Sequence, residues 1–106
     1  MKFVIKGPFK ENVYNLIREV GYRFQGKNEE RKELSFIRSL GGSDYSRFHL
    51  YLKVNSEINE IIFNLHLDQK RPIYKGVPAH SAEYESEIVK NEAERIKQTL
   101  KNYIFK

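Results

Sequence analysis

The sequence has no cysteine, which excludes disulfide bonds, thiol nucleophiles and thiolate metal sites. It also lacks long hydrophobic runs, whereas a membrane-spanning helix needs about 20 apolar residues in succession. The apolar residues 3–5 are followed directly by Lys6 and do not make the hydrophobic region of a signal peptide. These absences favour a soluble, cytoplasmic protein. A chain of 106 residues is expected to form a single domain over residues 1–106.

Negative charge is scarce in the first half of the chain. Residues 1–53 contain eleven Lys and Arg against six Asp and Glu, a net charge of +5, whereas residues 54–106 contain eight of each. A basic half attracts anionic partners, nucleic acid first, through long-range electrostatics. Small basic proteins that bind no polyanion share this excess, so the charge favours a class of partner without establishing one.

The hydrophobic pattern predicts a strand followed by a helix at the start of the chain. Residues 2–6 alternate as a short strand, and apolar residues over 13–20 recur at the spacing of one helix face. Gly21 is suited to end that helix as a left-handed cap.

Strands and polar turns follow in the middle of the chain. Residues 25–33 are almost wholly polar, which predicts an exposed turn or loop. Residues 34–40 read as a strand, and the Gly-Gly-Ser-Asp run at 41–44 as a turn. Residues 47–54 alternate between apolar and polar side chains, and residues 61–68 do so with Ile62 in a polar position, which predicts two half-buried strands.

A second helix is predicted near the C-terminal end. Ser81 is a suitable N-cap, and Val89, Ala93, Ile96 and Leu100 recur along one helix face. Two amphipathic helices require an apolar sheet face between them, so both should pack on the same side. We therefore expect an α+β two-layer sandwich: an antiparallel meander of three to five strands, two helices on one face, and the other face open to solvent or a partner.

The two alternating strands place chemically versatile side chains on that open face. If both apolar sets face the helices, the polar sets share the other side. Two registers satisfy this condition: one sets His49 opposite His66, and the other sets His49 opposite Asp68. An ordinary solvated face also carries polar residues, but Lys, Glu and Thr would serve it. The polar residues here are Arg47, His49, Tyr51, Lys53, Asn64, His66 and Asp68.

The spacing His66-x-Asp68, followed by His80, allows a metal site. Two histidines and a carboxylate are a common ligand set for Zn²⁺ or non-haem Fe(II), and Glu83 or His49 could supply a fourth ligand. A metal-free acid–base pair, in which Asp68 orients an imidazole, is the alternative. The catalytic candidates are therefore His66, Asp68, His80 and His49, and the metal candidates are His66, Asp68, His80 and Glu83.

The segment 69–80 is a long basic loop that leads into the last helix. It contains Lys70, Arg71, Tyr74 and Lys75, and cations beside a helix N-terminus suit a phosphate group. A proline-stiffened connection with solvated charges would have the same composition. Loops of this length are often functional.

Several short runs resemble a set of uncharacterised prokaryotic proteins of similar size. These runs are Arg-Phe-His at 47–49, Phe-Asn-Leu-His-Leu-Asp-Gln-Lys at 63–70 and Ala-His-Ser-Ala-Glu-Tyr at 79–84. The resemblance spans most of the chain from about Val13 onward and implies no function.

The order of elements is also similar in outline to double-stranded-RNA-binding domains and to the small mRNA-cleaving toxins built on that fold. Those toxins carry a catalytic histidine in a Gly-Ser-His run before the second strand. The comparable turn here is Gly26-Lys27-Asn28, without a histidine. The final helix also lacks a lysine cluster for gripping phosphates.

These observations favour a nucleic-acid-binding domain that contacts RNA or DNA through its open sheet face and the segment 69–80. The residues expected to contact phosphates or bases are Arg47, Lys53, Lys70, Arg71, Lys75, Tyr51 and Tyr74. A hydrolase or nuclease that depends on a divalent metal at His66, Asp68 and His80 is the first alternative. A module that docks a protein partner or a second copy is the other.

Overall fold

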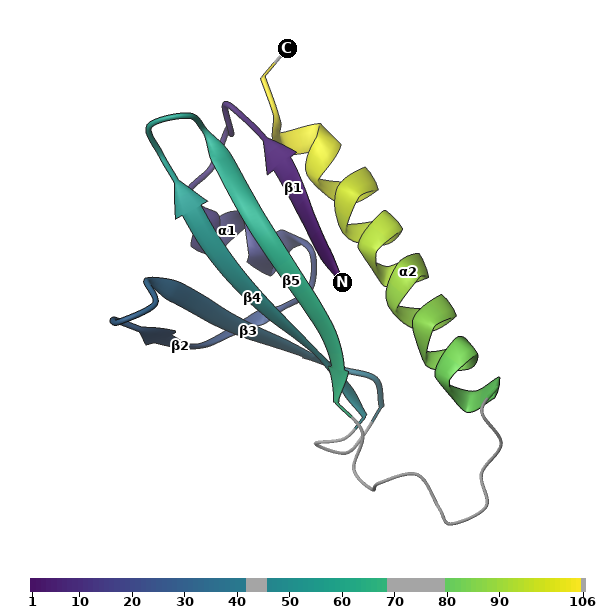
Figure 1. Cartoon of the computed structure of the whole chain (residues 1–106). Coiled ribbons are helices and arrows are strands. Elements are labelled where there is room, and N and C mark those ends of the chain that lie inside the picture. Colours follow the sequence, from purple (N-terminus) through teal and green to yellow (C-terminus); the bar gives the residue numbers. More distant parts are fainter. Residues whose placement is uncertain (42–45, 69–79, 106) are drawn as a thin grey trace.

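The computed structural model describes residues 1–41, 46–68 and 80–105, with the backbone alone for residues 80–85. The elements, in chain order, are β1 (Lys2–Lys6), α1 (Val13–Glu19), β2 (Arg23–Asn28), β3 (Glu33–Ser39), β4 (Arg47–Asn55), β5 (Glu60–Asp68), α2 (His80–Leu100) and the short 3₁₀ helix η1 (Lys101–Tyr103). The strands form one five-stranded antiparallel sheet in the order β1-β5-β4-β3-β2 (Figure 1). Within these described ranges, no helix is long and apolar enough to cross a membrane.

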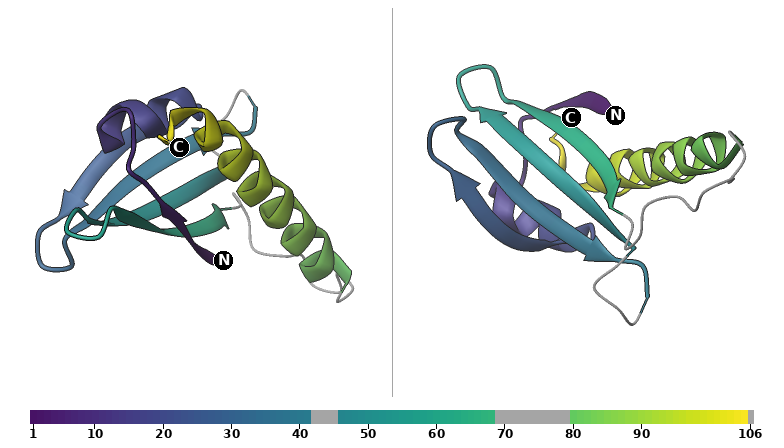
Figure 2. Two further views of the ribbon diagram at one scale, coloured as in Figure 1. Left: turned by 90° about the horizontal axis from the view of Figure 1, so that it is seen from above. Right: turned by 60° about the horizontal axis from the view of Figure 1, so that its bottom comes forward.

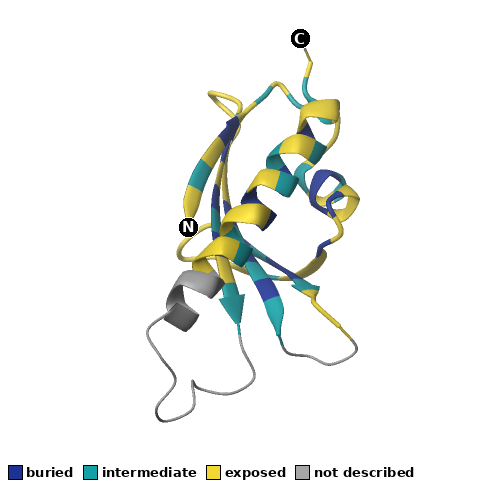
Figure 3. Ribbon diagram, turned by 90° about the vertical axis from the view of Figure 1, so that its right-hand side faces the viewer, coloured by how far each residue is buried: buried dark blue, intermediate teal, exposed yellow. Residues whose placement is uncertain are grey.

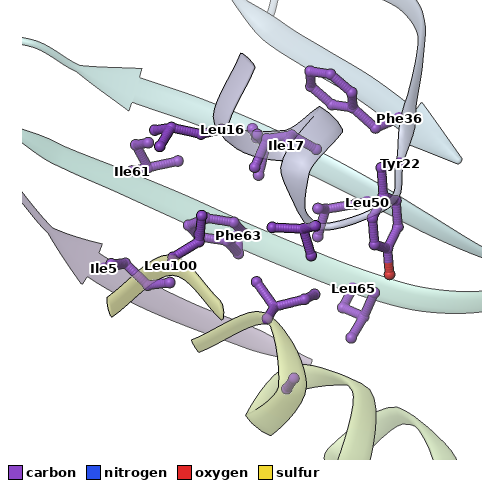
Figure 4. Close-up of a cluster of buried hydrophobic side chains, with 14 of the residues drawn as sticks. Ile5, Leu16, Ile17, Tyr22, Phe36, Leu50, Ile61, Phe63, Leu65 and Leu100 are labelled. Carbon is purple, nitrogen blue, oxygen red and sulfur yellow. The ribbon is translucent and has the colours of Figure 1, made fainter. Parts of the chain in front are cut away.

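Both helices cover the same side of the sheet (Figure 2). Leu16 and Ile17 of α1 and Leu100 of α2 are inaccessible to solvent and belong to one cluster with Leu50 and Phe63 of the sheet (Figure 4). The predicted α+β two-layer sandwich is therefore confirmed, with five antiparallel strands. We call the helix-covered side of the sheet its inner face and the opposite side its outer face.

The helix ends follow from local sequence. Asn12 caps α1, because its side-chain oxygen accepts a hydrogen bond of 2.9 Å from the backbone N–H of Asn15. Gly21 follows that helix with φ of +101°, the left-handed conformation predicted for it. Helix α2 begins at His80, one residue before the predicted cap Ser81. Its buried stripe faces the sheet and its polar side faces solvent (Figure 3).

The polar run 25–33 was predicted as a loop, and this prediction is wrong in part. Strand β2 extends to Asn28 and pairs with β3 through a register shift between Phe24 and Gly26. As an outermost strand, β2 pairs on one side only and exposes most of its side chains. It therefore shows no apolar alternation apart from Phe24, whose ring meets that of Phe36 at 5.4 Å.

Of the two registers allowed for β4 and β5, the structure adopts the one that sets His49 opposite His66 and Arg47 opposite Asp68. The turn between the strands accounts for this choice. Asn59, at its end, has φ of +53°, a left-handed conformation that asparagine tolerates well. The side chain of Asn55 accepts a hydrogen bond of 3.2 Å from the N–H of Glu57.

A buried carboxylate joins α2 to β3 and to the segment after α1. Glu92 is 4% exposed, and its oxygens accept hydrogen bonds from Tyr22 Oη at 2.6 Å and from Arg95 Nε at 2.7 Å. Arg95 also donates to the carbonyl oxygen of Val20 at 2.7 Å. Arg38 Nη1 lies 3.4 Å from the same carboxylate, which explains why a cation of β3 occupies the apolar inner face.

Candidate functional site

His49 lies at the centre of the outer face. Its opposed neighbours are Ile37 on β3 and His66 on β5. The His49 side chain is 16% exposed, and Ile37 is 2% exposed although it lies on the side that the helices leave uncovered. Both imidazoles point away from the helices, as the alternation predicted. The centre of this face is therefore packed, and His49 is held there in one orientation.

Three side chains from three neighbouring strands form a continuous hydrogen-bonded chain. Ser35 Oγ on β3 lies 2.5 Å from His49 Nε2 on β4, and His49 Nδ1 lies 3.2 Å from Asp68 Oδ2 on β5. Each contact joins diagonal neighbours on the outer face, because Ser35 is opposed by Tyr51 and Asp68 by Arg47. We call this set the Ser35–His49–Asp68 chain.

The partners of His49 determine which ring nitrogen carries the proton. An ionised carboxylate only accepts hydrogen bonds, so Asp68 requires the proton on Nδ1 of a neutral imidazole. Nε2 then has a free lone pair and accepts from the Ser35 hydroxyl. The Arg47 side chain lies 3.6 Å from the same Asp68 oxygen. The Ser35–His49–Asp68 chain therefore joins, in this order, a serine hydroxyl, a basic ring nitrogen and a carboxylate.

Aromatic rings line up beside this chain. Tyr51 stacks on His49 with ring centroids 4.2 Å apart and planes at 20°, and it meets His66 edge-on at 5.7 Å. Such ring pairs stabilise one another beyond their burial alone. The three rings therefore form an ordered aromatic row across β4 and β5.

A cavity of about 690 Å³ opens on the outer face beside the row. One wall is the β2–β3 hairpin, and the floor comes from β3, β4 and β5. Its lining residues are Gln25, Gly26, Lys27, Asn28, Arg31, Glu33, Ser35, Tyr51, Asn64 and His66. Since most of these carry hydrogen-bonding groups, the cavity suits a polar ligand.

His66 lines the cavity as a neutral imidazole at pH 7. Partial burial lowers its pKa from the ordinary 6.5, and the nearby N-terminal ammonium lowers it further. Asp68 acts in the opposite direction without reversing the shift. A neutral His66 can stack on a ring or donate one hydrogen bond and accept another.

The predicted metal site is not assembled within the residues that the structure describes. No group of three or more His, Cys, Asp or Glu side chains in that part of the chain is placed to hold a metal ion. His66 and Asp68 lie on the outer face as predicted, but the side chains of His80 and Glu83 are outside the description. The metal hypothesis remains a prediction that concerns those two positions.

Some of the predicted phosphate-binding residues lie in the described part of the chain and the others lie outside it. Arg47 and Tyr51 lie in the centre of the outer face, and Lys53 is exposed on the same face further along β4. Four of the predicted residues lie outside the described residues: Lys70, Arg71, Tyr74 and Lys75.

Sequence reasoning missed Ser35 and the hairpin wall of the cavity. Residues 34–40 were predicted as a strand of ambiguous facing, because Arg38 shares a side with Leu34 and Phe36, so Ser35 was assigned to neither face. Its contact with His49 depends on the β3–β4 register. Arg31 was assigned to an exposed turn or loop, and nothing in the sequence indicated that this residue lines a cavity on the outer face.

The chain was compared with protein-family models, with curated proteins and with solved structures, and none of the three comparisons found a match.

Proposed function

We propose that this protein binds single-stranded nucleic acid, RNA or DNA, on the outer face of its sheet. The observation that carries the proposal is the grouping of rings and cations around one cavity. Tyr51 and His66 belong to its floor, and Lys27 and Arg31 to its hairpin wall. The volume of about 690 Å³ lies within the range of roughly 300–1,000 Å³ of small-ligand sites, enough for a nucleobase with its sugar.

The aromatic row provides a stacking surface for bases. The Tyr51 ring stacks on His49 and meets His66 edge-on, so its side chain is already ordered and loses little conformational freedom when a base stacks on it. Base–aromatic stacking contributes about 1–3 kcal/mol per base and tolerates any sequence. Asn64, opposed to Tyr51, presents an amide that can pair with a base edge.

The cations around the cavity provide phosphate contacts. Lys27 is opposed to the inner-face residue Leu34, so its long side chain would bring the ammonium to the cavity around the free edge of β2. It makes an exposed ion pair with Glu29 at 3.7 Å, which is weak enough to be exchanged for a phosphate. The carboxylate of Glu33 also lines the cavity, so the phosphates should lie toward Lys27 and Arg31. Lys70, Arg71, Tyr74 and Lys75 belong to the same proposal because their segment follows directly after β5.

The first test removes the two hairpin cations. We expect the double variant Lys27→Ala/Arg31→Ala to bind labelled single-stranded RNA about tenfold more weakly or worse at low salt. The slope of log affinity against log salt should fall by about 1.4, since each lost phosphate contact contributes about 0.7 on single strands. Fluorescence anisotropy titrations at several salt concentrations measure both quantities.

The matched control removes two cations from the helix side of the molecule. Lys90→Ala/Lys101→Ala makes the same change in net charge at two exposed positions away from the cavity. It should leave the affinity within about twofold if binding is local to the outer face. Equal losses in the two double variants, or no salt-dependent binding at micromolar protein, would contradict the proposal. Tyr51→Ala should also weaken binding, and Tyr51→Phe should retain it.

A further inference from the structure

We infer that the Ser35–His49–Asp68 chain is a hydrolytic site, with Ser35 as nucleophile, for carboxylic esters that carry an anionic group. The chain has the three roles that nucleophilic catalysis requires: a hydroxyl, a base within hydrogen-bond reach of it, and a carboxylate that orients the base. Such sites are defined by geometry and roles, and they occur on unrelated folds.

The two hydrogen bonds use different nitrogens of one imidazole. Ser35 Oγ contacts Nε2 at 2.5 Å, and Asp68 contacts Nδ1 at 3.2 Å. Because Asp68 requires the proton on Nδ1, Nε2 is the nitrogen that can remove the proton of the serine. The stacked ring of Tyr51 and the packing around Ile37 keep His49 in this orientation.

The position of the Ser35–His49–Asp68 chain relative to the cavity fits these roles. Of the three members, Ser35 is the one that lines the cavity, whereas His49 and Asp68 do not belong to its lining. His49 is 16% exposed, so its basic nitrogen is partly shielded from water. A nucleophile must face the substrate and its base must lie within hydrogen-bond reach of it, and this placement meets both requirements.

Hydrogen-bond donors for a developing negative charge line the same cavity as Ser35. Tyr51 is directly opposite Ser35, and Asn64 is directly opposite Tyr51; both line the cavity. The Tyr51 hydroxyl lies 3.4 Å from His49 Nδ1, on the side of the imidazole away from Ser35, so the Asn64 amide is the donor that a carbonyl oxygen extending from Ser35 across the cavity would meet. Side-chain amides stabilise oxyanions in this way.

The reaction balances without a cofactor. Ser35 Oγ attacks the ester carbonyl carbon while its proton passes to His49 Nε2, and a tetrahedral oxyanion forms. The bond from carbon to the leaving oxygen then breaks, and His49 returns the proton to the departing alcohol. Water repeats the attack on the acyl-serine with His49 as base, which releases the carboxylic acid and restores the Ser35 hydroxyl.

The substrate class follows from the charged side chains of the cavity. The cavity is lined by two cations, Lys27 and Arg31, and one carboxylate, Glu33, so a carboxylate or phosphate on the substrate would pair with the cations and lie away from Glu33. This inference goes beyond nucleic-acid binding. Its assay contains no nucleic acid, so the two proposals can fail independently.

The full-length protein should hydrolyse 4-nitrophenyl hemisuccinate, and 4-nitrophenyl acetate about tenfold less efficiently, since the acetate lacks the anionic group. Ser35→Ala should lower kcat by about 10³-fold or more, whereas Ser39→Ala, on the same strand but outside the cavity, should match the unaltered protein. Asp68→Asn should lower kcat about 10²–10⁴-fold with little change in KM, because Asp68 is a positioning residue.

Covalent labelling gives a second readout that needs no variant. Diisopropyl fluorophosphate should inactivate the protein and place one diisopropylphosphoryl group on Ser35, located by peptide mass spectrometry. Hydrolysis by Ser35→Ala at the rate of the unaltered protein, or an unlabelled Ser35 in a protein that hydrolyses neither ester, would overturn the inference. Equal efficiency toward the two esters would overturn the anionic substrate class.

Discussion

Glu92→Gln is expected to lower the free energy of unfolding by about 2–4 kcal/mol, because it removes the charge that Tyr22, Arg38 and Arg95 share. The two arginine side chains are 33% and 38% exposed, so water partly compensates them and the loss stays below that of a fully buried ion pair. Urea unfolding followed by circular dichroism measures the change.

The control for Glu92 is another glutamate of the same helix. Glu94 makes an exposed ion pair with Lys97 at 3.4 Å, and Glu94→Gln should change the stability by no more than about 0.5 kcal/mol. Tyr22→Phe removes one neutral donor to the carboxylate and should cost about 1–2 kcal/mol. If Glu92→Gln and Glu94→Gln unfold at the same urea concentration, the buried network does not stabilise the fold.

The same carboxylate makes stability depend on pH. Burial alone would raise the pKa of Glu92, but hydrogen bonds from Arg95 and Tyr22 outweigh it, and the pKa lies below the ordinary 4.5. The unfolded chain therefore takes up this proton at a higher pH than the folded protein does. The stabilisation is fully present above pH 4.5 and is lost as the pH falls through the lowered value. Glu92→Gln should flatten the stability profile in this acid range.

Phe63→Ala should produce the largest loss of stability, about 3–5 kcal/mol. Phe63 is inaccessible to solvent, and the centroid of its ring lies 4.9 Å from that of Phe3, on which it stacks. On β5 it lies between the core side chains of α1 and those of α2 (Figure 4). Its removal leaves a cavity that the surrounding side chains can fill only partly. A domain with about 5–15 kcal/mol of stability would lose a large part of it.

Unfolding curves for two further variants make this prediction specific. Phe63→Leu retains much of the buried volume and should cost about half as much or less. Phe105→Ala removes the same side chain at a position that is 55% exposed and should cost about 1 kcal/mol or less. Similar losses for Phe63→Ala and Phe105→Ala would show that burial does not determine the effect.

Hydrophobic alternation was sufficient to predict most of the fold. Strands with one buried face, such as β4 and β5, have a period of two, and the condition that both apolar sets face inward left two registers. The choice between them depends on the turn that ends at Asn59, whose backbone conformation the alternation does not encode. The part of β2 over residues 25–28 was not predicted as a strand, because an outermost polar strand has no apolar period.

The candidate site was predictable only in part. His49, His66 and Asp68 were assigned to one face by alternation alone, and the structure places them there. The contact of Ser35 with His49 could not be predicted, because it needs the register of a third strand. The position of Arg31 in the cavity lining likewise could not be predicted, because it depends on where the polar β2–β3 hairpin lies relative to the other strands.

Because β1 pairs with β5, the first strand to be synthesised cannot join the sheet until the last strand has been made. The amino group of Met1 hydrogen-bonds to the carbonyl oxygen of Leu65, 64 positions further along the chain. A ribosome therefore releases β1 long before the strand that receives it, while β3, β4 and β5 can join as successive hairpins of short loop length. Closing so long a loop has a high entropic cost, so β1 should be the strand that docks last and detaches first.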